Sequence, residues 1–443
     1  MNVLVVDEGA RGHAEAWKIA QSPDCDRLMI AGGGAGTDEW AENIDIPVQD
    51  IEKIVSFAKQ NADLTVVSAD EPLAAGMVDA LQAEGLQAFG PTKAAAKIEW
   101  SKIFAKKLAY NRGIPTAEFT VVGDINFALY YADINQRTLY AKLDGLFAGK
   151  GAIKCREIED VEKALVKFAQ MGRFGNGKRV ILEDGLEGPE ISLQAWCDGL
   201  NYRMVPFAMQ DHKTRDANDE GPMTGGMAVV GPVPVITPED IQKLGQRFVK
   251  PALRALYQYG TPFKGMLFPG LVLTPEGPML LEWNARPGDP EAQVWIPLLD
   301  DDLLKIMMAV VEGRLGEYPD INWRQASAAC IVLATKGYPD HQRPGAISVI
   351  EGIEEVTQGE DLRIFQAGTK KIGNKLVATG GRSLNIVAVG SDGEDLSHVI
   401  ERGYSATDKI RFNGGRPVMR RDVGQKALSL AFEERVEATR HLF

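Results

Sequence analysis

The chain has 443 residues, of which 45% are hydrophobic and 25% are charged, and its formal net charge is −12. This composition is that of a globular protein with two to four domains, and it excludes the fibrous and disordered classes. The acidic balance argues against a nucleic-acid partner. The four cysteines lack CxxC spacing, which argues against a zinc site or a disulfide framework and fits a reducing cytoplasm. No signal peptide and no membrane span are predicted, because a basic leader and a run of about 18 apolar residues are both missing.

The first 110 residues alternate between short apolar strands and amphipathic helices. The pattern predicts strands over residues 2–7, 27–31, 64–68 and 87–89, and helices over residues 14–21, 50–60 and 74–84. Such alternation is typical of a doubly wound α/β domain with a parallel sheet. The glycine turn after the first strand lacks a full GxGxxG, which favours a plain strand-to-helix turn over a dinucleotide site. One further helix is predicted from residue 91 to about 111, with Lys102 as the candidate for a lysine that turns inward.

A glycine-rich segment follows the predicted strand that contains Lys142. An ammonium group in an apolar strand is tolerated only beside an anion, and a bound phosphate would supply one. Gly145, Gly149 and Gly151 predict a mobile loop whose backbone N–H groups close over phosphates, with Lys150 inside it. The alternative is a glycine-rich hairpin with Lys142 at a strand edge.

Two later segments combine charge with glycine and proline. Residues 179–190 predict a strand followed by a connection rich in glycine and proline. Extended backbone beside Leu186 could bind adenine through main-chain hydrogen bonds, and Glu190 could accept hydrogen bonds from ribose hydroxyls. Residues 210–215 and 221–227 predict a long polar loop, and such loops in compact enzymes usually carry function. The alternatives are an ordinary turn between subdomains for the first segment and an exposed surface loop for the second.

A predicted β-hairpin joins residues 263–274 to residues 278–291 through a Pro-Glu-Gly turn. Alternation along the second strand places Leu280, Glu282 and Asn284 on one face. Glu282 and Asn284 then lie roughly 7 Å apart at their Cα atoms, which suits Mg²⁺, a cation that takes few protein ligands and completes its shell with water and phosphate. The alternative is an edge strand whose Glu and Asn are solvated.

These segments together resemble the phosphoribosylamine–glycine ligases, also called glycinamide ribonucleotide synthetases, within the ATP-grasp superfamily. The resemblance covers nearly the whole chain and depends on the order of many motifs, each weak by itself. The motifs begin at Lys142 (KLDGLFAGKG), Leu182 (LEDGLEGPE), Gln210 (QDHK), Gly221 (GPMTGGM), Glu282 (EWNARPGDPE), Lys336 (KGYP), Ala367 (AGT) and Gly380 (GGR).

The resemblance implies an ATP-dependent ligase that joins glycine to 5-phosphoribosylamine through an acyl phosphate, in de novo purine biosynthesis. It implies ATP, with Mg²⁺ or Mn²⁺, between two antiparallel subdomains. The implied ATP contacts are Lys102, Lys142, Gly149, Lys150, Gly151, Glu183, Leu186 and Glu190, and the implied metal ligands are Glu282 and Asn284. The implied catalytic residues are Arg286, Asp211 and Lys213, and the implied substrate contacts are Gly9, Arg11, Thr224, Gly225, Gly226, Asp289 and Arg382. This chemistry depends on positioning and charge neutralisation, which agrees with five histidines that show no triad-like or metal-ligand spacing.

The chain departs from the family pattern mainly in parts expected to hold the second substrate. The family usually opens with Gly-x-Gly-Gly-Arg-Glu-His, where this chain has Asp7-Glu-Gly-Ala-Arg-Gly-His13. The other departures are Gly34, Met223, Ala228 and Pro287. Two alternatives therefore stay open, a ligase of the same fold that uses another amine or carboxylate and a nucleotide-binding protein without catalysis. The phosphate of the acceptor needs a cationic site, and the candidates are Arg11, Arg286 and Arg382.

The predicted architecture is α/β with three parts. Residues 1–110 are expected to form the doubly wound domain, residues 111–325 an ATP-grasp core with a lid near 120–195, and residues 326–443 a small α+β cap. The cap is predicted to contain strands over residues 328–334 and 386–389 and a helix from about Leu396. The expected partners are small-molecule substrates, without nucleic acid or membrane, and the expected state is a cytoplasmic monomer or weak homodimer.

Overall fold

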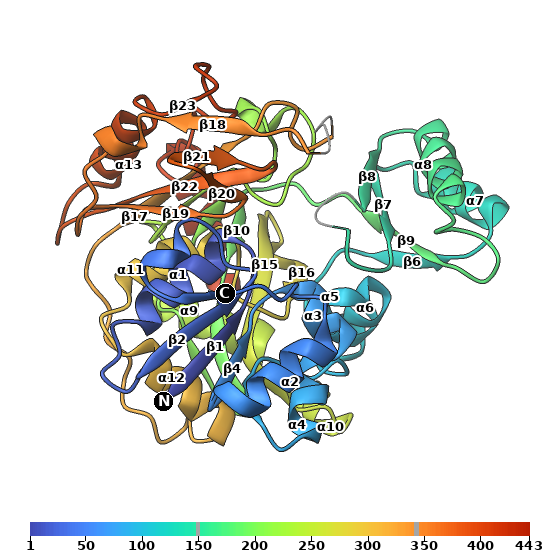
Figure 1. Ribbon diagram of the computed structural model, residues 1–443. Helices are drawn as coiled ribbons and strands as arrows, with labels where there is room; N and C mark the ends of the chain where they lie inside the picture. The colour runs from blue at the N-terminus through green and yellow to red at the C-terminus, as the bar shows by residue number, and fades with distance from the viewer. Residues whose placement is uncertain (148–150, 341–344) are drawn as a thin grey trace.

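The computed structural model describes residues 1–147, 151–340 and 345–443. Figure 1 shows a body formed by the amino-terminal and central segments, a carboxy-terminal part stacked on it, and a small subdomain that projects to one side. None of the helices within these described ranges combines the length and apolar composition needed to cross a bilayer.

The amino-terminal part contains a five-stranded sheet in the order β3-β2-β1-β4-β5, and all its pairings are parallel. Its strands are β1 (Asn2–Val6), β2 (Arg27–Ala31), β3 (Glu42–Ile44), β4 (Leu64–Val67) and β5 (Gln87–Phe89). Its helices are α1 (Ala10–Ile19), α2 (Ile51–Asn61), α3 (Asp70–Ala75) and α4 (Met77–Ala83). The predicted doubly wound α/β class is confirmed, and the carboxyl ends of β1 and β2 lead directly into Glu8, Gly9 and Gly32.

The prediction of one helix from residue 91 to about 111 is wrong. Two helices form, α5 (Lys97–Trp100) and α6 (Lys102–Asn111), because Ser101 between them adopts an extended conformation with φ −122°. The Ser101 hydroxyl accepts a hydrogen bond from the Phe104 N–H and donates one to the Asp144 carboxylate at 3.0 Å. Ser101 therefore caps α6, and a residue 43 positions away helps to hold the break.

The projecting subdomain, which we call the lid, is a four-stranded antiparallel sheet in the order β6-β9-β7-β8 with two helices on it (Figure 1). Its elements are β6 (Phe119–Val122), α7 (Ile125–Asn135), β7 (Leu139–Leu143), β8 (Ala152–Cys155), α8 (Ile158–Gln170) and β9 (Val180–Asp184). The lid has its own hydrophobic core, which includes Leu139, Phe168 and Val180. The proposed domain boundaries, including a lid near residues 120–195, stay a prediction.

The central sheet carries the predicted hairpin. Its strands follow the order β10-β15-β11-β12, and β16 also pairs with β15. They are β10 (Glu190–Ser192), β11 (Ala195–Gly199), β12 (Tyr202–Met204), β15 (Phe263–Thr274) and β16 (Gly277–Asn284). The hairpin between β15 and β16 is confirmed, and Gly277 adopts the positive φ of 107° that its turn requires.

A β-bulge changes the predicted face of one residue on β16. Gly270 pairs with Glu282 and the next residue, Leu271, pairs with Leu280, so Leu281 has no partner in the register. Leu280 consequently lies in the hydrophobic core with Trp283, and its predicted place beside Glu282 is wrong. Glu282 and Asn284 keep their two-residue spacing because the bulge precedes both.

The carboxy-terminal part shares a sheet with the centre of the chain. That sheet has the order β13-β14-β17-β22-β19, and a four-stranded sheet in the order β20-β21-β18-β23 lies beside it. The strands are β13 (Gln210–Asp211), β14 (Ala228–Gly231), β17 (Ala328–Ala334), β18 (Ser348–Glu351), β19 (Leu362–Gln366), β20 (Thr369–Ile372), β21 (Lys375–Ala378), β22 (Arg382–Val389) and β23 (Arg411–Phe412). The remaining longer helices are α9 (Pro238–Leu244), α10 (Lys250–Gln258), α11 (Glu291–Leu298), α12 (Leu303–Glu312), α13 (Leu396–Thr407) and α14 (Leu430–Thr439). Because β13 and β14 join the strands after residue 328, the 210–231 segment is anchored to the carboxy-terminal part.

Candidate active site

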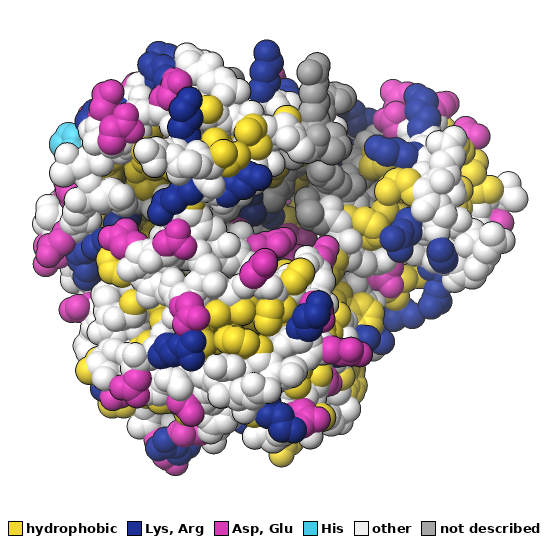
Figure 2. Space-filling model, in the orientation of Figure 1, with side chains coloured by type: hydrophobic (Ala, Val, Ile, Leu, Met, Phe, Trp, Pro, Cys, Tyr) yellow, Lys and Arg dark blue, Asp and Glu magenta, His cyan; other side chains and the backbone are white. Residues whose placement is uncertain are grey.

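Glu282 lies near the end of β16, and Figure 1 shows this strand on the side of the body that faces the lid. Charged side chains surround Glu282. The Lys213 Nζ lies 2.8 Å from a carboxylate oxygen of Glu190 and 3.7 Å from one of Glu282. Lys213 follows β13, Glu190 begins β10 and Glu282 lies on β16, so three separate segments of the chain contribute to the cluster. Figure 2 shows the surface hollowed between the lid and the body, with acidic side chains along one edge of the hollow and basic ones along the other.

The charge state of Glu282 is set by the cations around it. Burial opposes ionisation of this carboxyl, but Lys213, Lys102, Lys142 and Arg286 outweigh that effect and lower its pKa to about 2. Three of these cations also form ion pairs with other carboxylates, Lys213 with Glu190, Lys142 with Glu183 and Arg286 with Glu99. Basic side chains beside a carboxylate that can hold a divalent cation suit a metal-bound polyphosphate. The residues that lower the pKa of Glu282, the predicted metal ligand, are therefore themselves predicted ATP contacts or catalytic residues: Lys102, Lys142, Lys213 and Arg286.

The donor set fits a divalent cation that is shared with phosphates. Glu282 is held ionised, and Asn284, two residues farther along the same strand, offers a second oxygen. Among the described residues, no group of three or more His, Cys, Asp and Glu side chains is arranged to hold a metal by itself. A cation at Glu282 would complete its shell with water and phosphate oxygens, as Mg²⁺ usually does.

Lys142 has a protein partner that the sequence did not reveal. Glu183 on β9 is buried between two lysines, forming ion pairs with Lys142 and, at 2.9 Å, with Lys106. Burial opposes ionisation of Glu183, yet the two ammonium groups lower its pKa. The anion that makes the burial of Lys142 tolerable is thus Glu183, so this burial by itself does not indicate a bound phosphate.

Lys106 is a residue that sequence reasoning missed. Lys102 is the lysine that the sequence predicts to turn inward from the 91–111 helix, but only 6% of the Lys106 side chain is exposed. Its Nζ also donates a hydrogen bond to the Thr116 hydroxyl, which in turn donates to the Leu280 carbonyl on β16. Its position one helical turn after Lys102 is the signal that could have placed both lysines on the inward face.

Lys142→Met is expected to raise the dissociation constant for ATP roughly tenfold, because one cation near the phosphates is lost. The fold should also lose about 1–3 kcal/mol of stability, since Glu183 keeps only Lys106 as a partner. Calorimetric titration with ATP and thermal melts measure the two effects. Lys154→Met on the exposed side of the adjacent strand β8 is the matched control and should change neither. Unchanged ATP affinity in Lys142→Met would remove Lys142 from the ATP contacts.

Asp211 lies at the end of β13 beside another carboxyl group. Burial raises its pKa well above the ordinary value, and the nearby Glu291 raises it further. One Asp211 oxygen accepts a hydrogen bond from the His212 N–H at 2.6 Å, and Glu291 accepts one from the Ser192 hydroxyl at 2.9 Å. Asp211 can therefore hold a proton more readily than an exposed aspartate.

The three arginines predicted to hold the acceptor phosphate all have carboxylate partners. The Arg11 Nε lies 2.6 Å from Asp7, the Arg382 guanidinium lies 3.1 Å from Asp289, and Arg286 lies 3.0 Å from Glu99. Each pair reduces the net positive charge that an acceptor phosphate would meet.

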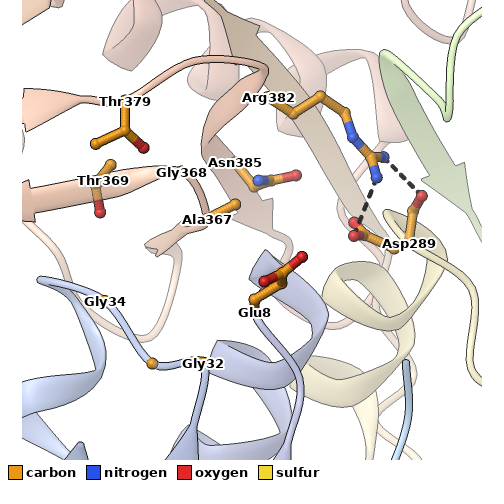
Figure 3. A pocket seen from close by; sticks show the side chains of 12 residues that line it. Glu8, Gly32, Gly34, Asp289, Ala367, Gly368, Thr369, Thr379, Arg382 and Asn385 are labelled. Carbon is orange, nitrogen blue, oxygen red and sulfur yellow. Dashed lines mark hydrogen bonds and ion pairs between the residues drawn. The ribbon is translucent and has the colours of Figure 1, made fainter. Parts of the chain in front are cut away.

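A cavity of about 420 Å³ lies between the carboxyl ends of β1 and β2 and the strands β20–β22 (Figure 3). It contains the predicted substrate residues Gly9, Asp289 and Arg382. Its lining residues are Glu8, Gly9, Gly32, Gly33, Gly34, Asp289, Ala367, Gly368, Thr369, Thr379, Arg382 and Asn385. In Figure 3 Glu8 points toward the open space between the Arg382–Asp289 pair and the glycine turn. Glu8 and Asn385 are lining residues that sequence reasoning did not single out.

Arg11, Thr224, Gly225 and Gly226 do not line this cavity, but Gly225 and Gly226 contact it through hydrogen bonds from Arg382. The Gly225 carbonyl accepts a hydrogen bond from Arg382 at 2.8 Å, and the Thr224 hydroxyl accepts one from the Gly226 N–H. Gly226 has a φ of 109°, and a Cβ there would lie 2.6 Å from Pro290. Glycine is therefore required at this position.

The other predicted ATP residues are only partly described. Leu186 is half-buried after β9, and Gly151 is buried immediately before β8. Gly149 and Lys150 lie outside the described residues.

The positions that depart from the family pattern lie in several different places. Asp7 holds Arg11, the Pro287 carbonyl accepts a hydrogen bond from Arg11 at 3.0 Å, and Gly34 lines the cavity. Met223 is largely exposed and Ala228 is buried in β14. Of these five positions, Gly34 alone lines the candidate acceptor cavity, and Asp7 and Pro287 meet at Arg11.

Family models of phosphoribosylglycinamide synthetase match three successive segments of the chain. The N domain matches residues 1–99, the ATP-grasp (A) domain residues 100–292 and the C domain residues 328–426. The chain belongs to the phosphoribosylglycinamide synthetase family. Membership makes it an ATP-dependent ligase with the ATP-grasp fold.

Individual relatives of the family extend over the full length. Phosphoribosylamine–glycine ligase of Rhodopirellula baltica is 39% identical over 441 residues, covering 97% of this chain and 98% of that protein. The enzyme of the same name from Mesorhizobium japonicum is 40% identical over 432 residues, covering 97% and 99%. The crystal structure of phosphoribosylamine–glycine ligase from Thermotoga maritima is 30% identical with a TM-score of 0.78, covering 95% of this chain and 100% of that one. A biotin carboxylase of Campylobacter jejuni, at 15% identity and a TM-score of 0.72, shares the fold alone and covers 98% of this chain and 96% of its own.

Proposed function

We propose that this ligase joins glycine to 5-phosphoribosylamine with ATP and Mg²⁺ or Mn²⁺, giving glycinamide ribonucleotide, ADP and phosphate. The observation that carries the proposal is the ionised Glu282 surrounded by Lys213, Lys102, Lys142 and Arg286. This arrangement suits a metal-bound polyphosphate. The full-length relatives named phosphoribosylamine–glycine ligase support the choice of substrates.

Each predicted nucleotide-binding and metal-binding residue would have a role that follows from its position. Lys102 and Lys142 would neutralise the phosphates, Leu186 and the 183–190 crossing would border adenine, and Glu190 would accept from ribose hydroxyls. Lys213, which contacts both Glu190 and Glu282, would link the ribose end of the nucleotide to its phosphate end. A divalent cation at Glu282 and Asn284 would draw negative charge from the transferring phosphoryl group.

The reaction needs two displacements. A carboxylate oxygen of glycine attacks the γ-phosphorus and ADP leaves; the amine nitrogen of phosphoribosylamine then attacks the acyl carbon and phosphate leaves. Arg286 and Lys213 would stabilise the negative charge that develops, and Asp211, with its raised pKa, would accept the proton that the amine loses. The other contribution of the protein is to hold the reacting groups together.

A ligase for a different amine is the second candidate, and the ion pairs of Arg11, Arg286 and Arg382 favour it, because each arginine is already neutralised by a carboxylate. Phosphate release from ATP separates the two candidates when it is measured with glycine plus freshly made phosphoribosylamine and with a panel of other acid and amine pairs. The proposal expects the first pair to be fastest by at least roughly tenfold. Faster release with another pair overturns it.

Arg382→Ala is expected to raise the KM for phosphoribosylamine roughly tenfold and to leave the KM values for ATP and glycine unchanged. The guanidinium lines the cavity and also holds Asp289 and the Gly225 carbonyl, so its loss removes a cation and loosens the wall. Steady-state kinetics with each substrate varied in turn measures the change. Arg402→Ala, whose side chain pairs with Glu394 instead, is the control. A normal KM for phosphoribosylamine in Arg382→Ala would place the acceptor elsewhere.

We still predict that the protein is cytoplasmic and that it is a monomer or a weak homodimer. Analytical ultracentrifugation over a range of concentrations tests the oligomeric part.

A further inference from the structure

Arg420 is a fully buried arginine in a segment that none of the predicted site residues belongs to. Its side chain is 0% exposed, and its guanidinium donates hydrogen bonds to the Thr214 hydroxyl at 2.7 Å and to the Thr214 carbonyl at 3.3 Å. It also contacts Asp219 at 3.1 Å and Asp422 at 2.6 Å and 2.8 Å. A buried guanidinium is tolerated only with such complete pairing, and its rigid fork then fixes the groups it binds.

The segment around Arg420 holds the 210–221 loop at further points. The Gly424 N–H donates to the His212 Nε2 at 3.1 Å, and the Asn218 N–H donates to Asp422 at 2.9 Å. Lys426 forms an ion pair with Asp219. We call residues 420–426 the clasp. Because the clasp forms hydrogen bonds with His212 and Thr214, it holds the residues on both sides of Lys213 in place.

The side chain of Lys213 extends from this fixed backbone into the candidate active site. Its ammonium group reaches Glu190 at 2.8 Å and Glu282 at 3.7 Å. The Lys213 carbonyl accepts hydrogen bonds from the Thr224 N–H and the Thr224 hydroxyl, each at 2.8 Å. The backbone of Lys213 is therefore held by the clasp through its neighbours and by Thr224 directly.

We propose that Arg420 is a positioning residue for the ligase reaction, which sets the Lys213 ammonium between Glu190 and Glu282 through its bonds to Thr214. This inference rests on the proposed function, because Lys213 has its role there. Arg421 provides a natural comparison. Its guanidinium is 41% exposed and pairs with Asp408 at 2.6 Å, on α13's carboxyl-terminal side, away from Thr214.

A double-mutant cycle tests the inference with the full chain. The variants are Arg420→Lys, Lys213→Ala, their combination, and the control Arg421→Lys. Arg420→Lys keeps the positive charge but loses the planar guanidinium, which binds several groups at once. We therefore expect kcat/KM for MgATP to fall roughly tenfold, with KM raised. If Arg420 acts through Lys213, kcat/KM for MgATP in the double variant should be no more than about twofold below that of Lys213→Ala alone. Arg421→Lys should behave as wild type. A purely structural role for Arg420 would instead lower kcat with the fraction of folded enzyme and leave KM unchanged.

Two results overturn the inference. One is a wild-type KM for MgATP in Arg420→Lys, and the other is losses that multiply in the combination, which would show that the two residues act independently. Thr214→Val removes the hydroxyl that accepts from Arg420 and donates to the Asp216 carbonyl. It replaces Arg420→Lys in the cycle if that variant does not fold, with the same expectations. Calorimetric binding of MgATP to each variant separates this test from the proposed function. Wild type that binds MgATP but does not ligate glycine to phosphoribosylamine refutes the proposed function, and the effect of Arg420→Lys on MgATP affinity still decides the inference.

Discussion

Glu282→Ala is expected to abolish turnover, with less than about a tenth of the wild-type rate left at saturating Mg²⁺. The carboxylate is held ionised with a pKa of about 2, and Asn284 lies two residues farther along the same strand, at a spacing that suits a second metal ligand. Without it, the charges of Lys213, Lys102 and Lys142 remain, but a divalent cation bound there would lose its anionic ligand. Phosphate release with saturating ATP, glycine and phosphoribosylamine measures the loss.

Two variants control this experiment. Glu276→Ala removes an exposed carboxylate from the turn of the same hairpin and should leave the rate unchanged. Glu282→Gln keeps the shape of the side chain but not its charge, so it should be nearly as inactive as the alanine variant. A rate above a tenth of wild type in Glu282→Ala, at saturating Mg²⁺, would refute the assignment of the metal site.

Glu183→Gln is expected to destabilise the lid by about 3–5 kcal/mol, because it leaves two buried ammonium groups without their shared carboxylate. The side chains of Lys106, Lys142 and Glu183 are at most 10% exposed, so water cannot replace the lost partner. Hydrogen exchange of the β7 and β9 amides reports the stability of the lid itself, which a melt of the whole multidomain chain would not isolate.

The matched control for Glu183→Gln is Glu187→Gln, which changes an exposed glutamate four residues farther along and should leave exchange unchanged. The combination Lys106→Met, Lys142→Met and Glu183→Leu removes all three charges and should restore slow exchange while activity stays lost. Because the pKa of Glu183 is lowered in the fold, its contribution is present above the ordinary glutamate pKa and is lost as the pH falls through the lowered value. Unchanged exchange in Glu183→Gln would show that the ion pairs do not hold the lid.

Several elements follow the sequence pattern almost to the residue. The strands predicted at 27–31, 87–89 and 328–334 form over those residues, and the hairpin turns where Pro, Glu and Gly succeed one another. Short apolar runs bounded by turn residues encode such elements locally. The helix predicted at 91–111 fails because its break depends on the Asp144 carboxylate, 43 positions from Ser101. The bulge before Glu282 likewise depends on pairing with β15.

The order of the motifs, by itself, determined the family, the reaction class and most of the residues that meet around Glu282, because residue types recur at local spacings that need no coordinates. The tertiary structure alone decided which charges neutralise each other. It paired Lys106 and Lys142 with Glu183, Arg382 with Asp289, and Arg420 with the loop of Lys213, across separations of 41 to 206 positions. Coulomb interactions between buried groups fall with distance in space and are indifferent to distance along the chain, so only the fold could assign these partners.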